Sequence, residues 1–260
     1  MRGELGRWPP VIALALLIFV PLSPLWPVSF LEKMHLVGYA ICHQMPEHSY
    51  HLGGRQLPLC ARCTGIYLGA LGGLLTLLAL GKGRAAKLPP LKLLTILLGF
   101  TILFAIDGLN SYLAFFPHTP HLYQPRNILR LATGTFHGLA LIIIAFPILN
   151  FTLWREAGEE SSVESFAELS LFVGVALFIV LIVHMGAPFF FHPLAIASIL
   201  GVIILFTMIN LLIVLVAARR EASAVALSDV TLPALGAVLL TFLELGAMDL
   251  LHILTELALP

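Results

Sequence analysis

Three cysteines and one histidine are the residues whose types and spacing best suit chemistry in this chain. Cys42 is followed directly by His43, and Cys60 and Cys63 form a Cys-x-x-Cys motif one loop later. The chain has 3 cysteines in all, so both motifs together use every thiol. Three thiolates and an imidazole are a common ligand set for tetrahedral zinc. We therefore predict that these four residues bind zinc.

The same cysteines allow a redox interpretation. Cys60 and Cys63 have the spacing of a thiol–disulfide exchange pair, and Cys42 would then exchange with a partner protein. Quinone-linked membrane oxidoreductases usually relay electrons between two cysteine pairs, whereas three cysteines leave one unpaired, which favours the metal. A structural disulfide or inert buried thiols are the plain alternative. His48 and His51 are rival fourth ligands, although loop histidines are usually just solvated.

A second group of polar residues predicts a cavity beside the cysteines. Asp107 and Asn110 share one face of an apolar segment, and Asn127, Arg130 and His137 lie on a stripe of the next. Ionisable residues inside membrane helices are costly, so they generally face the bundle interior and pair. We predict an Asp107–Arg130 ion pair, an Arg130 that holds a phosphate or carboxylate, and proton transfer by Asp107 or His137.

These residues must be positioned by membrane-spanning helices. The chain is 59% hydrophobic and 11% charged with a mean hydropathy of +1.00, which is far outside the composition of soluble proteins. Its 14 basic and 14 acidic residues balance, which excludes the basic surface of a nucleic-acid-binding protein. We predict an all-α fold, a polytopic transmembrane helical bundle that forms a single membrane domain over residues 1–260.

The apolar runs predict about seven spans and one short interfacial helix. Each run has about the 20 residues that a bilayer requires, and they lie near 8–26, 58–80, 91–112, 128–151, 168–185, 193–218 and 231–257. The first run imitates a signal peptide but lacks a cleavage site, so we expect a retained helix. Apolar residues at helical spacing predict the interfacial helix over 30–44.

Lys and Arg favour cytoplasmic loops, and their distribution predicts the orientation. One orientation places nine of them on the same side, namely Arg2, Arg7, Lys82, Arg84, Lys87, Lys92, Arg155, Arg219 and Arg220. It gives a multi-pass cell-membrane protein with a cytoplasmic N-terminus and an extracytoplasmic Cys motif in the loop 28–57. The loop 113–127 is then also extracytoplasmic, and the acidic loop 152–167 is a cytoplasmic solvated linker.

Basic residues that break this bias are expected to have specific partners. They are Arg55, Arg62, Arg126 and Arg130, with Lys33 as a snorkelling anchor. Gly65, Gly69 and Gly73 recur every fourth residue and predict a close-packing helix face. The last span carries four further polar residues without an assigned role, Glu244, Asp249, His252 and Glu256.

Two segments resemble a known family. They are Cys42-His43-Gln44-x-Pro46-Glu47-x-Ser49 with Gly53-Gly54-x-Gln56-Leu57-Pro58-Leu59-Cys60-Ala61-Arg62-Cys63-Thr64-Gly65, and Pro125-x-Asn127-x-x-Arg130-x-x-Thr133-Gly134. They are similar to DUF2085, a family of uncharacterised prokaryotic integral membrane proteins. The resemblance covers roughly the first 140 residues and implies a multi-span membrane protein, without an established activity.

Three functions follow from these observations. The first is a membrane metalloprotein whose zinc site adjoins a polar pocket, and which acts on a lipid or isoprenoid headgroup. Zinc held by all four ligands would be structural, whereas three protein ligands would leave a position that activates water. The second is a membrane thiol–disulfide oxidoreductase. The third is a transporter or accessory subunit, which the absence of an inverted repeat disfavours. The expected partners are membrane lipids and a lipid-like substrate.

Overall fold

The computed structural model describes residues 29–116 and 119–258, and the predicted span at 8–26 lies outside them. Within this part of the chain, six helices are long and apolar enough to cross a membrane. They are α3 (Ala61–Ala79), α4 (Leu91–Leu113), α5 (Asn127–Leu153), α6 (Phe166–Met185), α7 (Phe191–Ala217) and α8 (Leu227–Ala258). The all-α membrane bundle is confirmed, and the six predicted ranges agree with the helices to within a few residues.

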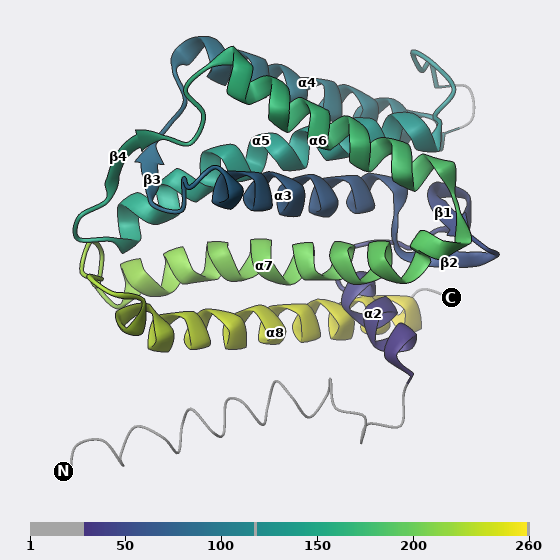
Figure 1. Cartoon of the computed structure of the whole chain (residues 1–260). Coiled ribbons are helices and arrows are strands. Elements are labelled where there is room, and N and C mark those ends of the chain that lie inside the picture. Colours follow the sequence, from purple (N-terminus) through teal and green to yellow (C-terminus); the bar gives the residue numbers. More distant parts are fainter. Residues whose placement is uncertain (1–28, 117–118, 259–260) are drawn as a thin grey trace.

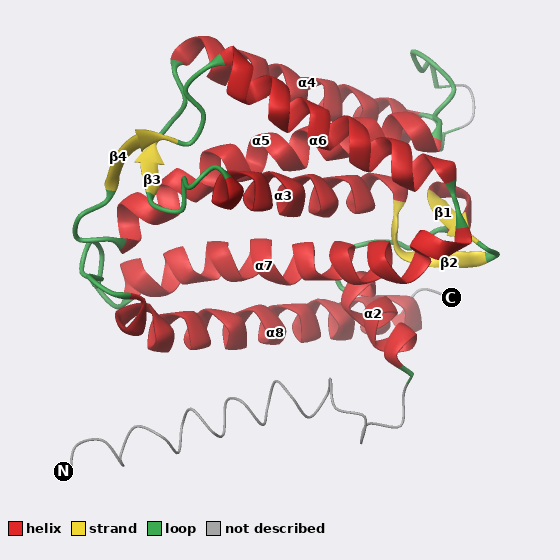
Figure 2. Cartoon of the chain, viewed as in Figure 1, coloured by secondary structure: helices red, strands yellow, loops and turns green. Residues whose placement is uncertain are grey.

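The six helices lie side by side along a common direction, and the strands of the described residues lie at the two ends of the bundle (Figures 1 and 2). The antiparallel pair β1 (Ser49–Leu52) and β2 (Arg55–Cys60) lies at one end, which we call the motif end. Helix α2 (Phe30–Tyr39) and the 3₁₀ turns Pro46–His48 and Pro188–Phe190 lie there too. The parallel pair β3 (Ala85–Lys87) and β4 (Gly158–Ser161) marks the opposite end.

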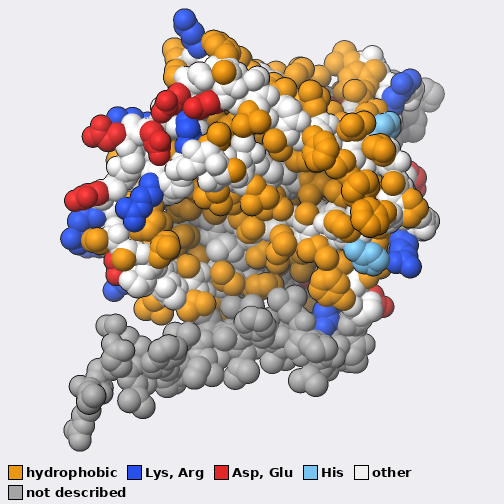
Figure 3. Space-filling view, viewed as in Figure 1, with side chains coloured by type: hydrophobic (Ala, Val, Ile, Leu, Met, Phe, Trp, Pro, Cys, Tyr) orange, Lys and Arg blue, Asp and Glu red, His pale blue; other side chains and the backbone are white. Residues whose placement is uncertain are grey.

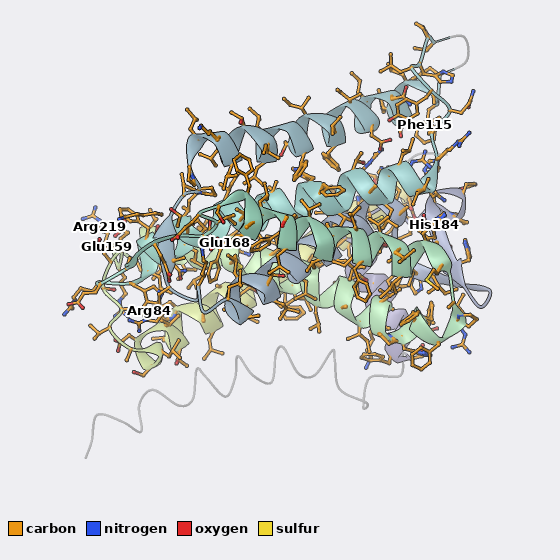
Figure 4. The ribbon with its side chains drawn as sticks, turned by 45° about the horizontal axis from the view of Figure 1, so that its top comes forward. Arg84, Phe115, Glu159, Glu168, His184 and Arg219 are labelled. Atoms are coloured by element: carbon orange, nitrogen blue, oxygen red, sulfur yellow. The ribbon has the colours of Figure 1, made fainter. Side chains whose placement is uncertain are left out.

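The surface suits a bilayer. Hydrophobic side chains cover the helices on the face that Figure 3 shows, and charged side chains gather mainly where β3 and β4 lie. Figure 4 places Arg84, Glu159 and Arg219 at this opposite end and Phe115 and His184 at the motif end. The exposed apolar side chains of α4, α6 and α8 therefore have lipid as their natural solvent, and the protein is a multi-pass membrane protein.

Helices α3 and α5 form the centre of the bundle and approach closely through glycines. A Cβ atom added to Gly65 or Gly69 would collide with the α5 backbone, and one added to Gly134 or Gly138 would collide with the α3 backbone. This confirms the close-packing face that the glycine spacing predicts, with α5 as the partner. Because backbones meet here without side chains between them, the start of α3 has a fixed position beside the start of α5.

The structure corrects the local prediction for the segment that carries the cysteines. Residues 49–60 form a hairpin rather than a polar loop, because Gly53 and Gly54 have φ of 60° and 79°, which suits a two-residue hairpin turn. Pro58 belongs to strand β2 instead of the first turn of a helix. Helix α3 therefore begins at Ala61, and Cys60 is its N-cap residue.

Two further expectations are wrong in detail. The interfacial helix ends at Tyr39 rather than near residue 44, and the Ser29–Glu32 capping box fixes its start. The acidic segment 152–167 is more than a solvated linker. It contributes β4 and buries Ser162 and Val163, while Lys82 at the same end donates a 2.7 Å hydrogen bond to Glu168 Oε2.

Candidate metal centre

The structure brings the three cysteines together. Cys42 lies in the turn after α2, Cys60 ends β2, and Cys63 lies in the first turn of α3. Their three sulfur atoms lie within 4.8 Å of one another, and all three thiols are free. Cys42 is only 2% exposed. Three sulfurs from three separate elements thus converge on one small volume at the motif end.

Two glutamines hold the Cys42 turn against its neighbours. Gln44 Nε2 donates to His35 O and to Pro58 O, both at 2.7 Å, and Gln56 Nε2 donates to Gln44 O at 2.7 Å. Gln44 adopts φ of 51°, a left-handed conformation that is unfavourable for a side-chain-bearing residue. These hydrogen bonds offset that strain, so the turn keeps Cys42 beside Cys60.

Hydrogen bonding gives the cysteines unequal acidity. The pKa of Cys60 is lowered, chiefly because the thiols of Cys42 and Cys63 donate hydrogen bonds to its sulfur. The pKa of Cys42 is raised, because its hydrogen bond to Cys60 requires its own proton. The Cys60 backbone N–H also donates to Cys42 Sγ at 3.2 Å. Thiolate is the form that binds metals, so the lowered pKa of Cys60 favours a metal-binding role.

The candidate fourth ligands do not join the sulfurs. His43 is exposed and is not among the groups that converge with the three thiols in the described residues. His48 contacts the Phe115 ring edge-on at 5.5 Å, and burial lowers its pKa. His51 is exposed on the hairpin. The structure thus brings together three of the four predicted zinc ligands, namely the three cysteines.

A pocket of about 420 Å³ adjoins the thiols at the motif end. Its wall comes from α4, α5, the start of α3 and the segment after α2. We call it the arginine pocket, and its lining residues are His43, Met45, His48, Cys60, Arg62, Gly108, Ser111, Tyr112, Phe115 and Arg130. Cys60 is the member of the thiol cluster that lines it, so one space is bordered by both a sulfur and two guanidinium groups.

The ion pair expected between Asp107 and Arg130 is wrong, because Asp107 pairs with Arg62. Arg62 Nη2 lies 2.5 Å from Asp107 Oδ2 and also donates to Ser111 Oγ at 3.0 Å. The Tyr123 hydroxyl donates to Asp107 Oδ1 at 2.8 Å, and burial followed by this hydrogen bond raises the pKa of Tyr123 to about 12. Both carboxylate oxygens of Asp107 thus have partners, and Arg130 is not one of them.

Of the five residues predicted to be catalytic, Arg130 is the one that lines the arginine pocket in the described part of the chain. Asn110 instead holds the following loop, accepting from Leu122 N at 2.6 Å and donating to Tyr123 O at 2.9 Å. Asn127 donates to Glu47 O at 2.9 Å. These asparagines fix the pocket walls, and their catalytic roles stay predictions.

His137 is not among the residues that line the pocket. Its ring stacks on Phe104 with centroids 4.2 Å apart, and Nδ1 hydrogen-bonds with Thr101 Oγ1 at 3.3 Å. It therefore connects α5 to α4.

On α8, His252 Nδ1 hydrogen-bonds with Tyr39 O at 2.9 Å, and Glu244 accepts from Asn210 at 2.7 Å. These contacts hold α8 against α2 and α7.

Arg62 is the pocket residue whose role the sequence interpretation missed. It is the third residue of Cys60-Ala-Arg-Cys63, and the signal was its position among the few basic residues that break the topology bias. Such residues are expected to have specific partners, and this one does. The Arg62 pair brings α4 to the start of α3, so the same residue lies close to the thiols and shapes the pocket.

We expect Asp107→Asn to lower the free energy of unfolding by about 2 kcal/mol, because Arg62 would stay partly buried without its counter-charge. The control is Glu159→Gln, since Glu159 is 94% exposed and 3.7 Å from Lys87, and exposed pairs contribute little. Thermal unfolding in detergent measures both. Equal stability of Asp107→Asn and the wild type would show that the Arg62 pair does not hold the helices.

Comparison with known proteins identifies a family. A family described as "Predicted membrane protein (DUF2085)" matches residues 42–144, which contain all three cysteines and both arginines of the pocket. An uncharacterized protein of Methanocaldococcus jannaschii is 33% identical over 123 residues, which are 47% of this chain and 72% of that protein. An uncharacterized protein of Methanothermobacter thermautotrophicus is 32% identical over 104 residues, 40% of this chain and 83% of that protein. No solved structure matches the chain. By these similarities, the chain belongs to the DUF2085 family of membrane proteins.

Proposed function

We propose that this chain is an integral membrane metalloprotein in which Cys42, Cys60 and Cys63 bind zinc. The observation that carries the proposal is the convergence of three sulfurs within 4.8 Å. A Zn–S bond of about 2.3 Å separates the sulfurs of a tetrahedral site by about 3.8 Å. An ion would therefore require only a small contraction of the cluster, and it would replace the hydrogen bonds that now connect the thiols.

We also propose that the fourth position of this zinc borders the arginine pocket. His43 is not among the groups that converge with the sulfurs, and Cys60 lies on the pocket wall. With three protein ligands, zinc can polarise a substrate or lower the pKa of a bound water. The pocket has the volume of a small-molecule site and lies at one end of the spans. The proposed substrate is therefore the headgroup of a lipid or isoprenoid.

The proposed orientation places this centre outside the cytoplasm. Among the described residues, Lys82, Arg84, Lys87, Arg155, Arg219 and Arg220 all lie in connections at the opposite end. Such clusters favour the cytoplasmic side. The motif end would then face an oxidising compartment, where bound zinc would protect the thiols from disulfide formation.

X-ray absorption at the zinc edge of the purified protein tests the coordination. We expect about three sulfurs at about 2.3 Å and one nitrogen or oxygen ligand. A first shell without sulfur would contradict the proposal, and an edge from another metal would correct its identity. His43→Ala decides the fourth ligand, because a closed site would lose its nitrogen shell whereas an open site would keep its spectrum.

A thiol–disulfide oxidoreductase is the second candidate, because Cys60 and Cys63 are free, close together and bordered by an open pocket. The sequence assigns the exchange with a partner protein to Cys42, but Cys42 is only 2% exposed whereas Cys60 lines the pocket. The Cys60 thiolate would therefore attack a disulfide of the partner protein and release one partner thiolate. Cys63 would then attack Cys60 Sγ, which leaves a Cys60–Cys63 disulfide and a reduced partner dithiol. Cys63→Ser should trap the mixed disulfide, and a variant that forms no adduct would end this alternative.

A further inference from the structure

Arg130 is a buried residue that has no carboxylate partner among the described residues. Arg130 is 6% exposed, and its guanidinium donates to Asn127 Oδ1 at 2.9 Å. Within the described residues, no other acceptor contacts this guanidinium and it makes no ion pair, because Arg62 and Tyr123 occupy Asp107. Removing a charge from water is costly unless it is paired and hydrogen-bonded. Arg130 therefore presents spare donors to the pocket that it lines.

Arg62 lines the same pocket and has an unsatisfied donor of its own. The Arg62 Nη2 donates hydrogen bonds to Asp107 and Ser111. Its Nε is buried and has no hydrogen-bond partner in the described structure. Because the Asp107 pair fixes the guanidinium plane, the Nε–H cannot turn to another acceptor without breaking that pair. Buried polar groups without partners are rare in proteins and call for an explanation.

Both arginines line one pocket, and an oxyanion is the class of ligand that two guanidinium groups attract there. Guanidinium groups bind phosphate through parallel N–H···O bonds. A tetrahedral phosphate offers acceptors in several directions, so it can accept from Arg62 and Arg130 together, whereas a carboxylate has only two oxygens in one plane. His43 and His48 add ring nitrogens to the same wall.

The rest of the pocket suggests where the phosphate comes from. Tyr112 and Phe115 line it and are 59% and 55% exposed, at the end of a membrane-spanning helix. Aromatic side chains at such helix ends lie at the membrane–water boundary. Gly108 lines the pocket from α4, and no atom lies within 4 Å of a Cβ added there, so this wall is open. A phosphate entering here would be level with lipid headgroups.

We propose that Arg62 and Arg130 form a binding site for the phosphate group of a phosphomonoester, with Asp107 as the residue that positions Arg62. The inference rests on the proposed function in one respect, since the metal centre is what makes the bound phosphate a substrate. The site itself requires only the two arginines and the open wall at Gly108. The proposed substrate class is a phosphorylated amphiphile.

Binding to the purified full-length chain tests the site. The probes are dioctanoyl phosphatidic acid, dioctanoylglycerol as the same lipid without phosphate, and inorganic phosphate. We expect the wild type to bind phosphatidic acid and not dioctanoylglycerol. Competition by inorganic phosphate would show that the site accepts free phosphate as well, and its failure to compete would identify the lipid as the source. Equal binding of both lipids would overturn the proposal.

Matched variants keep the result interpretable. Arg130→Gln and the pocket-filling Gly108→Leu should each weaken phosphatidic acid binding by about tenfold or more. Arg126→Gln, an exposed arginine close by, and Gly99→Leu, an open glycine elsewhere on α4, should leave it unchanged. Gly108→Leu retains every charge and its Cβ meets no atom within 4 Å, so it reports on the pocket even if Arg130→Gln fails to fold. Unchanged binding in Gly108→Leu would place the phosphate elsewhere.

Measuring zinc in the same samples separates this inference from the proposed function. Phosphatidic acid binding by a wild-type protein that lacks zinc would uphold the phosphate site and reject the metal centre. Zinc with no phosphatidic acid binding would reject the phosphate site alone. Wild-type zinc content in a Gly108→Leu variant that no longer binds the lipid is the result that we expect.

Discussion

Cys60→Ser is expected to lower the affinity of the proposed site for zinc by roughly a hundredfold or more. The substitution removes one of three thiolates, and structural zinc sites in proteins bind the ion with about 10–16 kcal/mol. The loss should be large, since Cys60 is the sulfur towards which the other two thiols direct their hydrogen bonds. Competition with a chromophoric chelator measures the affinity.

The control for this variant is His51→Ala, because His51 lies on the same hairpin but is exposed and apart from the sulfurs. We expect His51→Ala to bind zinc as the wild type does, with the same thermal stability. Folded yield should fall only for Cys60→Ser, since metal binding contributes to folding. Zinc content that is unchanged in Cys60→Ser would eliminate the three-cysteine centre.

Gly138→Ala is expected to destabilise the bundle by about 3 kcal/mol, because the added methyl group meets Ile66 O, a backbone atom that cannot move alone. Helices α3 and α5 would have to separate. Since α3 begins at the cysteines and α5 carries Arg130, the separation would also disturb the metal centre and the pocket. Thermal unfolding and zinc content measured on the same preparation report both effects.

Gly174→Ala is the matched control on α6, where an added Cβ meets no atom within 4 Å. There the substitution should be neutral or stabilise the helix slightly, since alanine has the higher helix propensity. A Gly138→Ala protein as stable as the Gly174→Ala protein would show that the close approach of α3 and α5 does not hold the molecule together.

The spans could be predicted from the sequence because a bilayer imposes its length and polarity on every helix. The convergence of the cysteines could be predicted from residue type, since thiols have few other uses at such spacing. The hairpin was missed because Pro58 also suits the first turn of a helix, although Gly53-Gly54 between alternating apolar residues was the available signal.

The partner of Asp107 could not be predicted in the same way. Arg62 and Arg130 both lie one turn inside the motif end, and the choice between them depends on how α3 and α4 are rotated about their axes. Helical spacing within one segment contains no information on that rotation. His43 is exposed beside a buried Cys42, and its role as the fourth ligand stays a prediction.

The most direct test of the metal centre is the zinc content of the detergent-purified protein by elemental mass spectrometry, combined with thiol counting. We predict about one zinc per chain and thiols that react only after a chelator removes the metal. Protein without metal, in which Cys60 and Cys63 form a disulfide and one thiol stays reactive, would contradict the metal centre and favour the oxidoreductase.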